Sequence, residues 1–173
     1  MHNDALNKII ATTEGMECFW RRSSGWAPAE AAKLLASARL DRQTSFTHTL
    51  HDYVEPFSPE QSDARQILGY ATLRSLCEGV LKIFFAVWLK DYLRDPDAPD
   101  RNGNVIPPEK VKFDRLIAFY TKKIDADYEP FLRRVQARGN AIHHFSDHDI
   151  GTQDELIEDI IHLGVPSNGC RLK

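Results

Sequence analysis

The feature of this sequence that most constrains its fold is a long apolar segment in the middle of the chain, from Ile67 to Tyr92. Its apolar residues recur at three- and four-residue steps, which is the period of an α-helix. Around Phe84 they occupy nearly every side of that helix. A helix without a polar face must be covered all round, so the sequence predicts a central helix, or one that also meets a second subunit.

Capping residues and prolines divide the rest of the chain into further helical segments. The predicted helices begin at Asn3 or Asp4, at Pro28, at Ser58, at Pro107-Pro108, at Pro130 and at Thr152. Ser58 with Gln61, and Thr152 with Glu155, have the spacing of a capping box. The segment from Pro28 carries one apolar stripe as far as Val54, which predicts a single helix there.

The other turn-forming residues of the sequence predict loops rather than strands. Turn-forming residues fill the segment 95–104, so we expect an irregular connection over residues 94–107, with Asn102-Gly103 at a tight turn. No segment alternates apolar and polar residues as a strand does, and 173 residues suit one domain. We therefore predict an all-α, single-domain bundle of five or six helices over residues 1–173.

Cysteines and termini favour a soluble protein of the cytoplasm. The three cysteines (Cys18, Cys77, Cys170) are too few and too scattered for a disulfide framework, and Cys77 has the setting of a small core residue. The first residues lack the pattern of a signal peptide, and no uncharged apolar stretch approaches the ~18 residues of a membrane span.

The charge is uneven along the chain. A net charge of −3 excludes a uniformly basic nucleic-acid-binding protein. From Glu109 to Arg138, however, eight Lys and Arg residues stand against five acids. Such a face could hold phosphate, with Lys122, Lys123 and Arg134 as candidate substrate-binding residues. A solvated helix surface is the alternative.

An arginine interrupts the apolar seam of the last long helix. The seam consists of Phe131, Val135, Arg138, Ile142 and Phe145, at spacings of 4, 3, 4 and 3 residues. A guanidinium turned toward a helix interface is costly unless it is paired. Arg138 therefore needs an anionic ligand, a second subunit, or a structural ion pair with Glu78 or another acid. Glu78 itself could instead pair with Lys82, four residues on.

Asn140, His143 and His144 follow Arg138 within a turn and a half of helix. This set suits cleavage of RNA, in which a histidine transfers the proton of a ribose 2′-hydroxyl and an arginine stabilises the charged phosphate. No metal or other cofactor is needed. Two alternatives remain open: histidines that interact with a helix C-terminus, and a metal site of His144 and His148 with neighbouring aspartates, which lacks an evident third strong ligand.

Arg138 and His143 resemble the Arg-x4–6-His signature of the HEPN superfamily, and His144 fits it with one more spacer. The resemblance implies a small helical bundle, a homodimer whose two subunits line a shared cleft, and metal-independent endoribonuclease activity. It assigns phosphate binding to Arg138, acid–base chemistry to His143 or His144, and a helping role to Asn140. In this family the polar residue usually follows the arginine directly, whereas here Gly139 intervenes.

Two functions from different classes follow. The first is a toxin or antiviral-defence endoribonuclease with an RNA substrate and an antitoxin or defence-system partner protein. The alternative is a non-catalytic HEPN-like module that dimerises and binds a protein or nucleotide. Trp20, Trp26 and Trp88 fit core or dimer anchors better than platforms for stacked bases.

Overall fold

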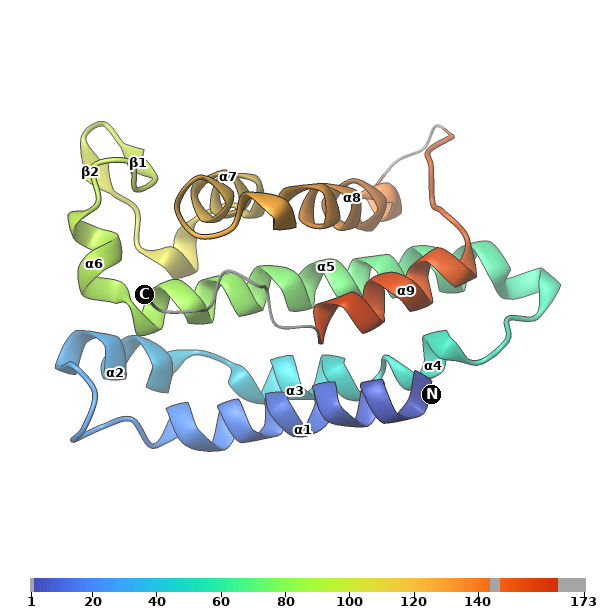
Figure 1. Cartoon of the computed structure of the whole chain (residues 1–173), viewed down its shortest axis with the longest axis horizontal. Coiled ribbons are helices and arrows are strands. Elements are labelled where there is room, and N and C mark those ends of the chain that lie inside the picture. Colours follow the sequence, from blue (N-terminus) through green and yellow to red (C-terminus); the bar gives the residue numbers. More distant parts are fainter. Residues whose placement is uncertain (1, 144–146, 165–173) are drawn as a thin grey trace.

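The long apolar segment forms helix α5 (Ser62–Val87) at the centre of the computed structural model, which describes residues 2–143 and 147–164. Figure 1 shows α5 between two layers of helices, with α9 (Gln153–Leu163) beside it. One layer holds α1 (His2–Arg21), α2 (Ala29–Ser37), α3 (Leu40–His48) and α4 (His51–Val54). The other holds α7 (Phe113–Lys123) and α8 (Glu129–Gly139). The predicted central helix is confirmed, and the domain is mostly helical.

The main core lies where α5 meets α7, α8 and α9. Leu73 of α5, Leu116 of α7, Val135 of α8 and Ile160 of α9 are fully buried there. Burial of each such side chain contributes about 1.5–3 kcal/mol. Cys77 is buried in the same core as predicted, and burial raises the pKa of its thiol.

The single helix predicted from Pro28 to Val54 is wrong, because three helices take its place. The chain is extended at Ala38, where α2 ends, and Leu40 then starts α3. Leu35 and Leu40 both belong to a second core cluster, with Ile83 and Ala86 of α5. Five residues along a straight helix would turn them about 140° apart. The break lets both leucines face the same cluster.

The segment from Ser58 also differs from its prediction. Ser58 makes no side-chain capping bond, and a short 3-10 turn, η1 (Pro59–Gln61), precedes α5. At the other end the helix breaks at Trp88, and α6 (Leu89–Arg94) follows. These breaks explain why the predicted count of five or six helices is too low. The capping box of Thr152 and Glu155 is present, as predicted, at the start of α9.

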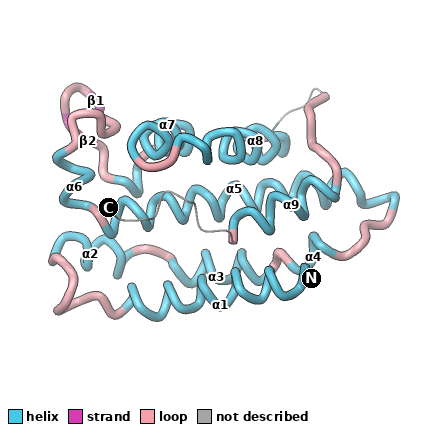
Figure 2. The backbone as a smooth tube through the Cα atoms, in the orientation of Figure 1, coloured by secondary structure: helices cyan, strands magenta, loops and turns pink. Residues whose placement is uncertain are grey.

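The connection over residues 94–107 is more ordered than predicted. Strands β1 (Asp100–Arg101) and β2 (Asn104–Val105) pair antiparallel, and Figure 2 shows them as a small hairpin in a loop region. Asn102 and Gly103 have φ of 55° and 78°, the left-handed conformation of a tight hairpin turn. Three 3-10 turns complete the described chain: η2 (Pro108–Lys110), η3 (Ala126–Tyr128) and η4 (Ala141–His143). No helix within the described ranges is long and apolar enough to span a bilayer.

Candidate functional site

Arg138, the predicted phosphate-binding residue, lies in the last turn of α8 and is 7% exposed. Its Nε donates a hydrogen bond to Asp149 Oδ2 at 3.2 Å. Its Nη1 donates to the Tyr70 hydroxyl at 2.8 Å, and its Nη2 donates to Glu155 Oε1 at 3.0 Å. Arg138 is thus held in a structural ion pair, but with Asp149 and Glu155 rather than with Glu78.

Arg134, a predicted substrate-binding residue, lies one turn earlier on α8 and belongs to the same group of hydrogen-bonded side chains. Its guanidinium donates two hydrogen bonds to Asp159, at 3.1 and 2.5 Å. Asp159 is 2% exposed and also accepts a hydrogen bond from the Tyr70 hydroxyl at 3.0 Å. The arginine–carboxylate network, as we name it, consists of Tyr70, Arg134, Arg138, Asp149, Glu155 and Asp159. It joins α5, α8, α9 and the segment that leads into α9.

The electrostatics of this network work against an additional anion. The hydrogen bond from Arg138 and that from the Thr152 backbone lower the pKa of Glu155. The Gly151 N–H and then Arg138 lower the pKa of Asp149. Burial opposes the charge of Arg138, but hydrogen bonds within the network outweigh it and raise its pKa. Two guanidinium groups therefore face three carboxylates, a net charge of −1 (+2 − 3) that does not attract phosphate.

Gly151 packs closely against the guanidinium of Arg138, so its replacement tests the packing of this network. Its φ is 70°, and a Cβ at this position would lie 2.6 Å from Cζ of Arg138. Gly103 has a similar φ of 78°, but a Cβ there would meet nothing within 4 Å. Both Gly→Ala changes incur the left-handed cost of about 1–2 kcal/mol. We expect Gly151→Ala to lower the free energy of unfolding, measured in urea, by about 1–3 kcal/mol more than Gly103→Ala, because it also overpacks Arg138. Equal losses in the two variants would contradict this packing.

Asn140 and His143 lie in the turn directly after Arg138. Asn140 caps the C-terminus of α8, and its carbonyl accepts a hydrogen bond from the His143 N–H at 3.0 Å in η4. The imidazole of His143 is exposed. The predicted seam continues only to Arg138: Ile142 is 46% exposed, because α8 ends at Gly139 and η4 turns it outward. His144 and Phe145 lie outside the described residues.

Arg74 of α5 is a neighbour of this turn that the sequence patterns did not single out. A Cβ on Gly139 would lie 2.6 Å from Cβ of Arg74 and 2.9 Å from the Tyr70 carbonyl, so α8 and α5 approach closely here. The Nε of Arg74 is buried and has no hydrogen-bond partner among the described residues. Its Nη2 lies 3.7 Å from Glu78 Oε2, a loose pair. Glu78 has its closer contact with Lys82, at 2.7 Å, which confirms the i, i+4 pairing considered above.

Lys122 and Lys123, the other predicted substrate-binding residues, are not near this turn. They lie at the end of α7 and pair with the loop after α6: Lys122 with Asp97 at 2.8 Å, and Lys123 with Asp95 at 2.8 Å. Hydrogen bonds from Lys122 and then Lys123 lower the pKa of Asp97 to about 2. The positive charge that the sequence suggested for this stretch is therefore largely neutralised within the chain.

Neither a metal cluster nor a known relative adds to this site. Within residues 2–143 and 147–164, no group of three or more His, Cys, Asp or Glu side chains could hold a metal ion. Comparison of the chain with protein-family models, with curated proteins and with solved structures finds no match.

Proposed function

We propose that the chain is a metal-independent endoribonuclease that acts through the turn after α8. The observation that carries the proposal is the exposed His143 in η4, the turn that directly follows the anchored Arg138. The stem of Arg74 packs against Gly139, at the start of the same turn. An exposed imidazole at a rigidly attached turn can reach a large polymeric substrate. The resemblance of Arg138 and His143 to the HEPN signature supports the same function.

The structural contacts change the role that this proposal gives to Arg138. Asp149, Tyr70 and Glu155 already take three of the five N–H donors of Arg138, and its side chain is only 8% exposed, so a phosphate has little access to it. Arg138 is therefore a positioning residue that fixes the end of α8. Arg74 is the better phosphate-binding group, because its side chain is 29% exposed and its ion pair with Glu78 is loose, at 3.7 Å.

The chemistry needs few groups because RNA carries its own nucleophile. His143 takes the proton of the ribose 2′-hydroxyl, and the 2′-oxygen attacks phosphorus. The bond from phosphorus to the 5′-oxygen breaks, that oxygen takes up a proton from water, and His143 returns its proton to the solvent. Positioned proton transfer contributes about 10²–10⁴-fold, and one charge stabiliser contributes ~3 kcal/mol. The resemblance further suggests a toxin or defence effector controlled by a partner protein.

The direct test is incubation of the purified protein with total RNA in EDTA. We expect fragments that end in a 2′,3′-cyclic phosphate and begin with a 5′-hydroxyl. Intact RNA, or cleavage that depends on an added divalent metal, would contradict the proposal.

A second candidate function is an assembly module without chemistry. The internal pairing of Arg134, Arg138, Lys122 and Lys123 favours it, since these cations are not free for a polyanion. Intact RNA in the test above, together with stable self-association, would support this alternative.

A further inference from the structure

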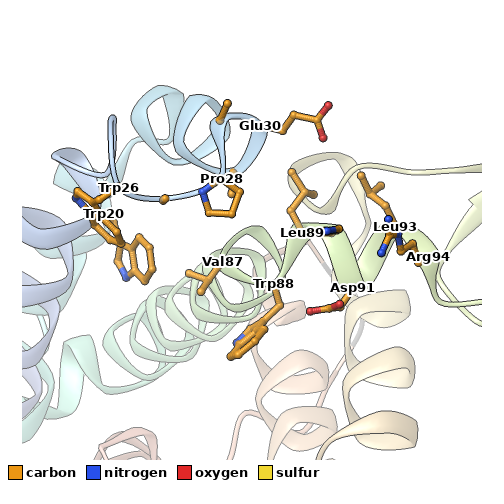
Figure 3. A pocket seen from close by; sticks show the side chains of 14 residues that line it. Trp20, Trp26, Pro28, Glu30, Val87, Trp88, Leu89, Asp91, Leu93 and Arg94 are labelled. Carbon is orange, nitrogen blue, oxygen red and sulfur yellow. The ribbon is translucent and has the colours of Figure 1, made fainter.

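A large apolar hollow lies at the end of the molecule where α2 meets α6. It is a cavity of about 740 Å³. One wall comes from the end of α1 and the start of α2, with Trp20, Trp26 and Pro28. The other comes from the end of α5 and from α6, with Trp88 and Leu93 (Figure 3). The hollow thus gathers all three tryptophans of the chain.

Aromatic side chains at this hollow are exposed, and those of Phe19, Trp20 and Trp26 pack against one another. Trp26 is 53% exposed, Trp88 is 47% exposed and Phe19 is 55% exposed. The ring centroids of Phe19 and Trp26 are 4.7 Å apart, and those of Trp20 and Trp26 are 5.3 Å apart. The Trp26 indole N–H also donates to the Arg22 carbonyl at 2.8 Å. Exposed, preorganised aromatic groups of this kind mark an interaction surface, because burying them costs little conformational entropy.

The charges on the two walls of the hollow indicate which partner could bind there. The wall from α1 and α2 carries a single charged lining residue, Glu30, and so a charge of −1. The wall from α5 and α6 carries Lys90, Asp91 and Arg94, and so a net charge of +1 (+2 − 1). In a two-fold dimer the same surface meets itself, so one subunit's α2 wall can lie over the α6 wall of its partner. This arrangement sets the negative wall against the positive wall twice.

We propose that this surface, the tryptophan face (Trp20, Trp26, Pro28, Glu30, Trp88, Leu93 and Arg94), binds a second copy of the chain. It is separate from the turn after α8: Tyr70, at that turn, and Trp88 are 18 residues apart along α5, about 27 Å at ~1.5 Å per residue. Each subunit therefore keeps its own His143 away from the interface, unlike the shared-cleft dimer that the HEPN resemblance implies. The proposal goes beyond the ribonuclease and does not depend on it.

The first experiment measures the molar mass of the full chain by sedimentation equilibrium over a wide range of concentration. We expect a monomer–dimer equilibrium. Leu93→Asp should weaken dimerisation by at least ~30-fold, because it places a charge in the apolar part of the interface. Leu68→Asp is the matched control: Leu68 is also an exposed leucine, 47% against 38% for Leu93, but it lies near the other end of α5. A chain that stays monomeric, or a dimer that Leu68→Asp disrupts and Leu93→Asp does not, overturns the proposal.

The second experiment tests the identity of the partner by exchanging charges. Glu30→Lys and Arg94→Glu should each raise the dissociation constant of the dimer about tenfold, because each sets like charges against one another. The double variant Glu30→Lys/Arg94→Glu restores opposite charges and should return to within ~3-fold of the original value. Only a surface that meets itself predicts this rescue. Additive weakening in the double variant overturns the two-fold arrangement, and circular dichroism verifies that each variant is folded.

Discussion

Replacement of His143 by alanine is expected to slow RNA cleavage by a factor of about 10²–10⁴, the contribution of a positioned proton-transfer group. The free energy of unfolding should change by less than ~0.5 kcal/mol, because the imidazole is exposed and surface substitutions of this kind are nearly neutral. The measurement is the rate of cleavage of a labelled RNA in EDTA, beside a urea unfolding curve. A large loss of activity at unchanged stability separates a catalytic histidine from a structural one.

His48 provides the matched control for this change. It is also exposed, on α3, and it pairs with Glu14 at 3.1 Å. His48→Ala should leave cleavage unaltered. Arg74→Met should lower the rate by about 10²-fold, the effect of one charge stabiliser. If His143→Ala cleaves normally and His144→Ala does not, proton transfer belongs to His144. If both variants cleave normally, the proposed ribonuclease site is wrong.

Local signals in the sequence were sufficient for much of the fold. The capping box of Thr152 and Glu155 forms with the predicted partners, and Asn102-Gly103 takes the predicted tight turn, in the left-handed conformation. These features depend on residues a few positions apart. The breaks at Ala38 and Trp88 depend on what the flanking residues pack against, for example Leu35 and Leu40 in a common core cluster. An apolar period continues through such a break and does not reveal it.

In the candidate site, too, some features could be predicted from the sequence and others could not. The position of Arg138 on an apolar seam predicted that it needs a partner, but the sequence could not identify which acid. Glu155 acts twice: its Oε2 accepts from the Thr152 backbone, and its Oε1 accepts from Arg138, 17 residues away in the chain. Its capping role is visible in the sequence, whereas its ion pair follows from how α9 packs against α5 and α8. Arg74 was missed for a similar reason, since only the close approach of Gly139 brings it to the turn.

Replacement of Arg134, the more exposed arginine of the network, is expected to destabilise the protein more than replacement of Arg138, the more buried one. The side chain of Arg134 is 43% exposed and that of Arg138 is 8% exposed. Arg134→Met nevertheless leaves Asp159, 2% exposed, with the Tyr70 hydroxyl as its one side-chain partner among the described residues. An uncompensated buried carboxylate costs about 3–5 kcal/mol. Arg138→Met should cost less, about 1–3 kcal/mol, because the exposed Asp149 can turn to water and what is lost is mainly charged hydrogen bonding and packing.

Removal of the unpaired charge of Asp159 should restore most of the stability that Arg134→Met loses. Asp159→Asn keeps the shape of the side chain and an oxygen that accepts the Tyr70 hydroxyl, but it removes the carboxylate. We therefore expect Arg134→Met/Asp159→Asn to be more stable than Arg134→Met alone by about 1–3 kcal/mol, measured from urea midpoints at constant m-value. The rescue arises because a buried ion pair costs most when one partner is missing. If Arg134→Met is milder than Arg138→Met, or if Asp159→Asn weakens it further, Asp159 is not held as a buried charge. Arg134 would then be available for an external anion, as its place in the sequence first suggested.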